Sequence, residues 1–315
     1  MKKLTNQDVP ILLIGFNRPE FLLDRLRELQ KMPIKHLYIS IDGNPNSDKS
    51  SMLSVVDYAN GAFSKLENLN IEIQSENLGL AKHLTTAISK VFNTFSHIVV
   101  IEDDISMSLN FYQNMLSGFN FQQTNHLRGI IGAFSPLNFS SIRVFNNKWR
   151  TSKYCSIWGW GCTKSVWADY DLTLKNVDFR KSLENSQVWQ ELSKFQQNLW
   201  INRFIKIQNN PYHTWDIQFQ YMSFCENLQH LVPLFRVTEN DGFADERSSN
   251  TKERRPWWLG PRRRFYPKRV YKQSGFRFES FFNLLESITL IGDLNTTVRK
   301  LRIMSQLVRR YRNPL

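Results

Sequence analysis

The sequence lacks the features that mark several large classes of protein. It has no apolar stretch close to the roughly 18 residues that a membrane-spanning helix needs. It also has neither a GxGxxG loop nor a Walker A loop, which argues against a dinucleotide-dependent enzyme and against a P-loop NTPase. The apolar run near its start, Pro10 to Phe16, is too short for the core of a signal peptide and indicates a first β-strand instead.

Cysteine is scarce. The three cysteines, Cys155, Cys162 and Cys225, are odd in number and form no pair of CxxC motifs, which favours reduced thiols in a cytosolic protein over a disulfide framework or a zinc site. Hydrophobic residues make up 41% of the chain and aromatic residues 13%, so a disordered protein is excluded. A chain of 315 residues can bury the core of one large α/β domain and still carry an appendage.

Acidic residues are rare in one part of the chain only. From Thr251 to the end there are 16 of the 41 lysines and arginines but only 4 of the 28 acidic residues. The rest of the chain is therefore nearly neutral, although the whole chain carries a net charge of +13. We predict two parts, a neutral domain over residues 1–250 and a basic C-terminal extension over residues 251–315.

Short apolar runs alternate with helical patterns through the first hundred residues. The expected strands are Ile11–Phe16, Leu37–Ile41, Ile71–Gln74 and Ile98–Ile101. Helical spacing of apolar residues follows Pro19, spans Ser51–Leu66 and resumes after Asn77. Repeated strand–helix–strand units predict an α/β fold with a mostly parallel sheet that is covered by helices on both faces, as in Rossmann-like proteins.

Polar residues follow three of these strands where each one ends. They are Asn17-Arg18, Asp42-Gly43 and Glu102-Asp103-Asp104. Three consecutive carboxylates repel one another, and this cost is relieved by a hard divalent cation that also holds a phosphorylated ligand. The alternative is a solvated turn whose acidic residues are favoured by the dipole of the next helix. Because ligands bind at the carboxyl ends of such strands, the three sites together favour a nucleotide diphosphate with a metal ion.

The order of motifs carries a family resemblance. FNRP, IDG, NLGLAKHLTTAI, VVIEDDI and NFY follow one another in an order that resembles the nucleotide-sugar-binding half of GT-A glycosyltransferases. Within that group the chain is similar to bacterial family-2-like transferases and to N-acetylglucosaminyltransferase I, from about Val9 to Phe243. The resemblance implies a GT-A type mixed sheet and a metal-dependent, inverting transfer from a nucleotide-diphosphosugar, with UDP-sugars as the first candidates and Mn²⁺ or Mg²⁺ as the cofactor.

The resemblance also assigns roles to individual residues. Asp104 is expected to bind the metal directly, whereas Glu102 is expected to support the metal from behind or to contact the ribose. The residues expected around the nucleotide sugar are Asn17, Arg18, Asp42, Gly43, Asn77, Gly79, Lys82, Glu102 and Asp103. Many relatives carry a histidine near the diphosphate after a segment like Asn240 to Phe243, but this chain does not, so Arg247 becomes a candidate for that place.

Two segments of the second half offer further site residues. Trp158 and Trp160, with Gly159 between them, are expected to form a wall beside the sugar, because the C–H faces of sugar rings pack well on indoles. A buried tryptophan cluster is the alternative, and it is the one we prefer for Trp167. Asp216 either satisfies free N–H groups at the start of a helix that Thr214 caps, or acts as a general base. The resemblance selects the general base for Asp216, and a structural role is expected for His213.

The basic extension interleaves arginines with aromatic residues in ERRPWWLGPRRRFYPKR, which is followed by two stretches of helical pattern. Such a composition fits an anionic membrane surface, docking on the catalytic domain or single-stranded nucleic acid. We expect the membrane and no nucleic acid, with a cytoplasmic enzyme that sits peripherally on the inner face of the plasma membrane. The acceptor is then a saccharide or a lipid-linked saccharide, and the pathway builds a surface polysaccharide or lipopolysaccharide. A sugar-phosphate nucleotidyltransferase and a non-catalytic binder that acts through the extension stay open as alternatives.

Overall fold

The computed structural model describes residues 2–44, 49–135, 149–233, 236–243, 245–247 and 255. Almost all of the basic extension therefore lies outside the described residues, and the boundary at residue 250 stays a prediction. Within the described part of the chain, no helix is both long enough and apolar enough to cross a membrane.

Strands and helices alternate through the first half of the chain, as expected. The strands are β1 (Ile11–Gly15), β2 (His36–Ile41), β3 (Asn68–Ile73), β4 (His97–Glu102), β5 (Ile105–Met107), β6 (Ile131–Gly132), β7 (Trp149–Ser152), β8 (Trp160–Thr163), β9 (His230–Pro233) and β10 (Thr238–Asn240). The helices are α1 (Pro19–Leu29), α2 (Lys49–Ala62), α3 (Leu80–Val91), α4 (Phe111–Asn125), α5 (Lys164–Trp167), α6 (Phe179–Leu183), α7 (Gln187–Gln190), α8 (Lys194–Asn209) and α9 (Asp216–Cys225).

The central sheet has the order β3-β2-β1-β4-β8-β6-β9-β7. Its first four strands are parallel, whereas β8 runs antiparallel to both β4 and β6. The chain leaves β1 toward β2 and β3 and then returns to the other side of β1 as β4, so the strand order reverses between β1 and β4. In open α/β sheets, ligands bind in the crevice at such a reversal. The expected mixed, mostly parallel α/β sheet is confirmed.

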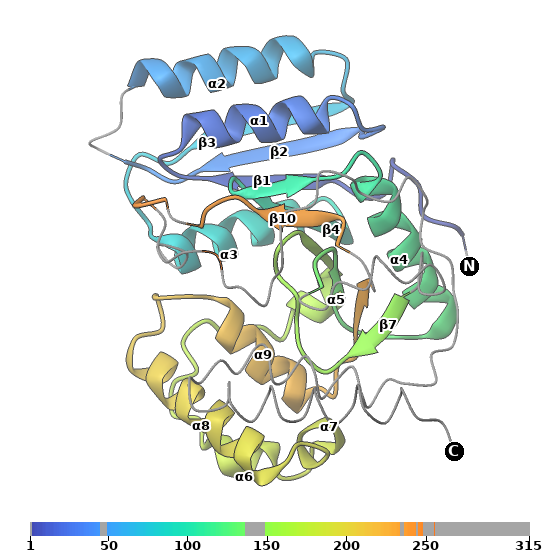
Figure 1. Cartoon of the computed structure of the whole chain (residues 1–315), viewed down its shortest axis with the longest axis vertical. Helices are drawn as coiled ribbons and strands as arrows, with labels where there is room; N and C mark the ends of the chain where they lie inside the picture. The colour runs from blue at the N-terminus through green and yellow to red at the C-terminus, as the bar shows by residue number, and fades with distance from the viewer. Residues whose placement is uncertain are drawn as a thin grey trace, which may run out of the picture.

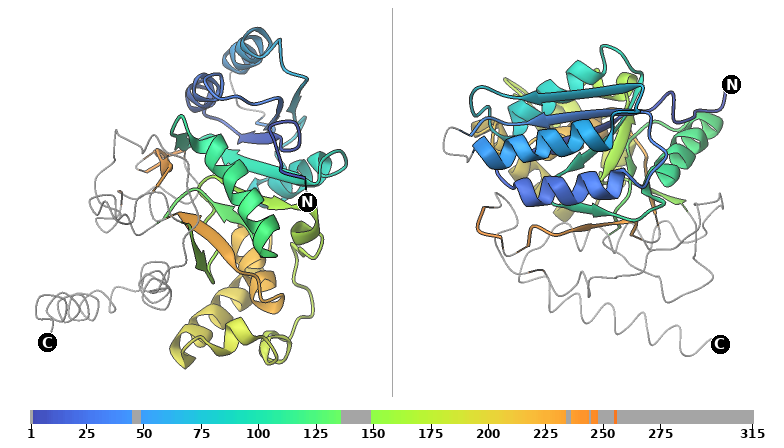
Figure 2. Two further views of the ribbon diagram at one scale, coloured as in Figure 1. Left: turned by 90° about the vertical axis from the view of Figure 1, so that its right-hand side faces the viewer. Right: turned by 90° about the horizontal axis from the view of Figure 1, so that it is seen from above.

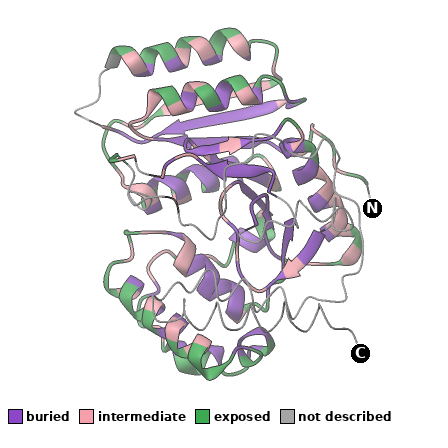
Figure 3. Ribbon diagram, in the orientation of Figure 1, coloured by how far each residue is buried: buried purple, intermediate pink, exposed green. Residues whose placement is uncertain are grey.

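The period of two along the strands divides the core between the faces of the sheet. Ile11 and Leu13 of β1 pack with α1, α2 and α4 on one face. Leu12 and Ile14 pack with α3, α5 and α9 on the other face. Helices α1 and α2 lie together on one side of the sheet, and the side views show the layering (Figures 1 and 2). The strands are buried almost throughout, and the exposed residues gather on the outer sides of the helices (Figure 3).

A separate apolar cluster joins α6, α7, α8 and α9 beside the sheet (Figure 1). Ser193 begins α8 with a capping box, in which its hydroxyl accepts from the backbone of Gln196 and the Gln196 side chain accepts from the backbone of Ser193. Asp178 and Ser186 cap α6 and α7 in the same general way. The sequence over residues 176–209, with Phe, Trp and Ile at helical intervals, predicts connecting helices, and the structure confirms them.

A short ribbon of β5 and β10 departs from the expected elements. The sequence predicts one late strand over Leu231–Val237 and a loop over Glu239–Phe243, but the structure ends β9 at Pro233 and places Glu239 within β10. Thr238 to Asn240 pair antiparallel with Ile105 to Met107, directly after the acidic triplet. Glu and Asn have low intrinsic preference for strands, so this strand depends on its long-range pairing and could not be read from local pattern.

Replacing Ile101 by alanine should lower the free energy of unfolding by about 2–5 kcal/mol, because its side chain is 1% exposed in the central strand. Urea denaturation followed by circular dichroism measures the change. The matched control is Leu53→Ala on α2, where the side chain is 58% exposed and the expected change is within about 0.5 kcal/mol. Equal unfolding midpoints for the two variants would contradict the central position of β4.

Candidate functional site

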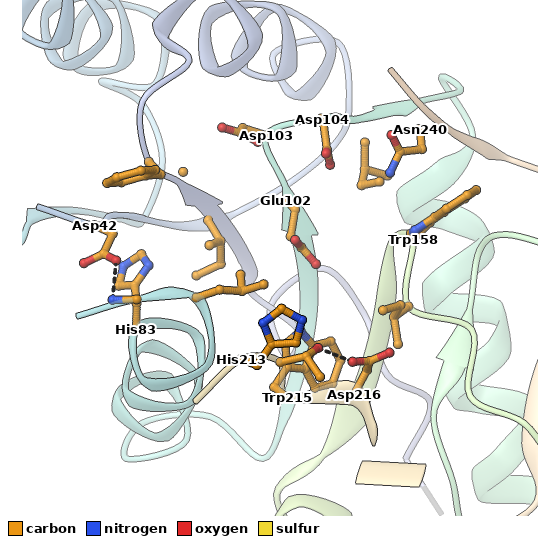
Figure 4. Close-up of a pocket in the computed structure, with 18 of the residues that line it drawn as sticks. Asp42, His83, Glu102, Asp103, Asp104, Trp158, His213, Trp215, Asp216 and Asn240 are labelled. Atoms are coloured by element: carbon orange, nitrogen blue, oxygen red, sulfur yellow. Dashed lines mark hydrogen bonds between the residues drawn. The ribbon is translucent and has the colours of Figure 1, made fainter. Parts of the chain in front are cut away.

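The carboxyl ends of β1, β2 and β4 open into one cavity of about 630 Å³, a size typical of small-ligand sites. The register sets Ile14 opposite Glu102 and Gly15 opposite Ile41, so the residues that follow the three strands lie at the same edge. Figure 4 shows Asp42, Glu102, Asp103 and Asp104 around the cavity, with Asp216 across from Glu102. The expected site residues that line it are Asn17, Arg18, Asp42, Asn77, Gly79, Glu102, Asp103, Asp104, Trp158 and Asp216.

Asp42 holds the loop that precedes α3. Its Oδ1 accepts hydrogen bonds from the backbone N–H groups of Gly43 and Leu78, and its Oδ2 accepts one from Gly79, each at 2.9 Å. The Gly79 N–H also donates a hydrogen bond to Asn77 Oδ1 at 2.8 Å. Gly79 has a φ of +76°, a conformation that favours glycine. The carboxylate therefore shapes this end of the cavity through backbone contacts while it also lines the cavity.

Arg18 lies against the acidic triplet. Its Nε donates to Asp103 Oδ2 at 3.2 Å, and its Nη2 also pairs with the other oxygen of that carboxylate. The same Nη2 lies 3.3 Å from Asp104 Oδ2. The two aspartates are only 3% and 8% exposed, so water hardly solvates their carboxylates. The Arg18 guanidinium compensates their negative charge instead.

A second buried arginine supports the turn from below. Arg25 donates to the backbone oxygen of Asp103 at 3.3 Å and pairs with Asp241 and Glu28. Glu28 in turn accepts from the Met107 backbone N–H at 2.9 Å, and the Asp241 N–H donates to the Asp104 oxygen at 2.7 Å. Helix α1 and the β5–β10 ribbon thus hold both sides of the acidic turn.

The ionised form of the Glu102 carboxyl is disfavoured by its surroundings. Burial raises its pKa, and repulsion from Asp104, Asp103 and Asp216 raises it further, to about 8. Burial also raises the pKa of Asp103, to about 6, although Arg18 opposes this shift. A site that pushes carboxyl pKa values upward in this way favours the entry of a cation.

The donor set fits a hard divalent cation of a particular kind. Among the described residues, no group of three or more His, Cys, Asp or Glu side chains converges as a complete metal cage. A cation that takes one or two carboxylates and completes its shell with phosphate oxygens and water needs no such cage. Asp104 lies at the cavity with Asp103 beside it, so the residues fit this second kind of site.

Asp216 is the first residue of α9. The preceding Trp215 is the N-cap and makes no side-chain cap bond, which corrects the expectation that Thr214 caps this helix. The Thr214 hydroxyl instead donates to Asp216 Oδ1 (Figure 4). One carboxylate oxygen is therefore held in place by a neighbour, and the side chain lines the cavity opposite Glu102.

The aromatic segment divides into one cavity residue and one core residue. Trp158 lines the cavity and packs on Phe134 and Phe243, with ring centroids 4.3 and 5.7 Å away. Trp160 is only 1% exposed and stacks on Trp215, which corrects the expectation that it forms part of a sugar wall. Its position on β8 beside β4 turns the indole into the core. Trp167 is buried, as expected.

Three other expected residues do not line the cavity. Gly43 is pressed against the chain, since a Cβ there would lie 2.4 Å from the backbone of Glu76. Gly159 has a φ of +75°, and a Cβ there would lie 2.9 Å from Thr238. Lys82 is exposed on α3. These glycines serve close packing and backbone conformation.

The cavity also contains residues that sequence reasoning did not place there. These are chiefly His83, Arg203 and Lys206, whereas Asn240 belongs to the segment over residues 239–243 that the sequence predicts to close the site. His83 Nε2 lies 2.8 Å from the Ser40 hydroxyl, and burial lowers the pKa of this histidine. Its place one turn after Gly79 in the NLGLAKHL segment is a signal that could have found it. Arg247, expected near the diphosphate, does line the cavity and pairs with Glu20 and Asp245.

No family model matches the chain, and no curated protein matches it significantly in sequence. Among solved structures, the chain is similar to a mannosyltransferase from Pyrobaculum calidifontis, solved with GDP-Man and Mn²⁺, at 10% identity and a TM-score of 0.39 over 70% of this chain and 86% of that one. It is also similar to TarS of S. aureus at 13% identity and a TM-score of 0.37, covering 52% of this chain and 30% of TarS.

Replacing Asp42 by asparagine should lower the free energy of unfolding by about 1–3 kcal/mol, because the amide NH₂ that replaces one oxygen would face a backbone N–H and cannot accept from it. Urea denaturation followed by circular dichroism measures the loss. Asp171→Asn is the control, since Asp171 accepts from Thr173 in an exposed turn away from the cavity. Equal unfolding midpoints for the two variants would show that the 77–79 loop does not depend on Asp42.

The stability of the protein should fall as pH rises from about 4.5 to about 7, because burial raises the pKa of Glu28 to about 7. In this window the folded state binds the proton that the unfolded state has already lost, so raising the pH favours unfolding. The effect should be on the order of 1 kcal/mol or more. The urea midpoint of unfolding should decrease less steeply with pH in Glu28→Gln than in the wild type. Identical pH dependence in the two proteins would exclude Glu28 as the source.

Proposed function

We propose that the protein is a metal-dependent, inverting glycosyltransferase that moves a sugar from a nucleotide-diphosphosugar to an acceptor hydroxyl. The observation that carries this proposal is the opposition across one cavity of an acidic turn held by an arginine and a single carboxylate, Asp216, on a separate helix (Figure 4). The turn suits a metal diphosphate, and the carboxylate suits the activation of a hydroxyl.

The donor would lie across the sheet edge. The 77–79 loop and Asp42 border the part of the cavity suited to the nucleoside, while Arg18 suits bidentate contact with a phosphate. Asp104, with Asp103 beside it, would hold Mn²⁺ or Mg²⁺, and Glu102 would support these residues from the end of β4. When bound, such an ion supplies positive charge to the leaving diphosphate.

Asp216 would act as the general base. The acceptor oxygen attacks the anomeric carbon from the side opposite the diphosphate, and its proton passes to the Asp216 carboxylate as the bond to the diphosphate breaks. The Thr214 hydroxyl occupies Asp216 Oδ1, which leaves the other oxygen to accept the proton. Trp158 would support a sugar ring at the same wall of the cavity.

The wider role of the chain follows as part of the proposal. Residues 1–250 would form the transferase domain, and the basic residues 251–315 would hold it at an anionic membrane surface on the cytoplasmic side. A lipid-linked saccharide is the acceptor best suited to such a place, which would put the enzyme in surface polysaccharide or lipopolysaccharide synthesis. UDP-sugars are the first donors to test.

The test is a panel of UDP- and GDP-sugars, incubated with the full chain with and without Mn²⁺ or Mg²⁺. At least one donor should bind and release its nucleoside diphosphate. Asp104→Asn should abolish the increase in this release that the metal ion causes. Asp24→Asn, which changes an exposed aspartate on α1, is the matched control and should behave as the wild type. The proposal fails if no donor is bound or hydrolysed. Release of pyrophosphate from nucleoside triphosphates would indicate a nucleotidyltransferase instead.

Replacing Asp216 by asparagine should lower the rate of transfer about 10²–10⁴-fold, because the base is lost, while the affinity for the donor stays unchanged. Transfer to the acceptor and donor binding are measured separately, and the anomeric configuration of the product is read by NMR. Asp169→Asn on the exposed surface is the control. A variant that retains full transfer, or a product of retained configuration, would exclude this role for Asp216.

A further inference from the structure

Helix α8 presents two cations to the same cavity. Arg203 and Lys206 are three residues apart, so they share one face of the helix, and both line the cavity together with Ile207. His213 and Thr214, which precede Asp216, line the same side. None of these positions belongs to the sheet edge that carries the acidic turn.

Arg203 is partly buried at the edge of the cavity. Its guanidinium packs over the Trp200 ring at 4.9 Å, and burial lowers its pKa, although the nearby charge of Asp216 acts in the opposite direction. The dipole at the C-terminal end of α8 accounts for a lysine in the last turn, such as Lys206. Arg203, one turn earlier, lies close to the charge of Asp216 and lines the cavity beside it.

Two cations at the opposite side of the cavity pair with acidic residues outside α8 and α9. Arg18 pairs with Asp103 and Asp104, and Arg247 pairs with Glu20 and Asp245. Lys206, in contrast, has no ion pair or hydrogen bond with any residue that the structure describes. Positive charge on α8 therefore faces the cavity on the side of Asp216 rather than compensating the acidic turn.

We propose that Arg203 and Lys206 form a subsite for an anionic group, a phosphate or a carboxylate, on the acceptor saccharide. This inference rests on the proposed function, because it takes Asp216 as the group that meets the acceptor hydroxyl. A guanidinium and an ammonium on one helix face suit such an anion, and binding it there places a neighbouring hydroxyl near Asp216. The pair would thus select acidic acceptors over neutral ones.

The test compares three probe sugars, glucose 6-phosphate, glucuronate and glucose, bound to the full chain and followed by ligand-observed NMR. At least one acidic sugar should bind about tenfold or more tightly than glucose, and added salt should reduce the difference. The first two sugars distinguish a phosphate site from a carboxylate site. Equal binding of all three would overturn the inference.

Variants of α8 assign the effect to this subsite. Lys206→Gln and Arg203→Gln should each remove most of the preference for the acidic sugar. Arg203→Lys keeps the positive charge and should retain part of the preference, and it replaces Arg203→Gln in the test if that variant does not fold. Lys194→Gln is the matched control, because it removes a charge from the same helix away from the cavity. A preference that survives the double change of Arg203 and Lys206 to glutamine would overturn the inference.

Donor binding separates this inference from the proposed function. The α8 variants should bind a nucleotide-diphosphosugar as tightly as the wild type does. If they lose donor affinity instead, the two cations serve the donor diphosphate and the acceptor subsite is wrong. If no donor binds to the wild type but acidic sugars still bind through α8, the glycosyltransferase proposal fails while the anion subsite stands.

Discussion

The repulsion among the carboxylates that end β4 is the constraint on which the site depends. A buried strand delivers Glu102, Asp103 and Asp104 to one turn, and solvent has little access to the two aspartates. Arg18 relieves part of this repulsion from the end of β1, and Arg25 holds the backbone of the same turn. Both arginines come from the segment that follows β1, so the parallel pairing of β1 with β4 brings the opposing charges together.

Arg18 relieves the repulsion among the carboxylates only in part, so the turn favours the binding of a further cation. The pKa of Glu102 stays near 8 in spite of Arg18, so the turn still gains from a further positive charge. In the proposed complex, a divalent ion and its diphosphate would supply both the positive charge and the oxygen ligands that the turn lacks. The guanidinium of Arg18 would contact a phosphate, a ligand that its planar fork fits as well as it fits a carboxylate.

Much of the sheet edge could be predicted from the sequence, because it depends on local signals. Buried strands of β-branched residues and the polar residues after them are visible in the chain, and parallel strands place their ends together. The β5–β10 ribbon and the cations of α8 could not be predicted in this way. Their positions depend on contacts between segments far apart in sequence, as when Asp241 meets Asp104. Trp160 was misplaced for the same reason, since composition does not tell which face of a strand an indole occupies.

The position of Trp160 in the core explains how the acidic turn and Asp216 are held at a fixed separation. It pairs with Val100 across β4 and β8, two residues before the acidic turn begins. Its indole stacks on Trp215 with ring centroids 4.8 Å apart, and Trp215 is the N-cap residue of α9. Asp216 follows at once. A single buried stack thus connects the strand that carries the acids to the helix that carries the proposed base. Because close-packed rings resist displacement, this stack holds Asp216 at a set depth opposite Glu102.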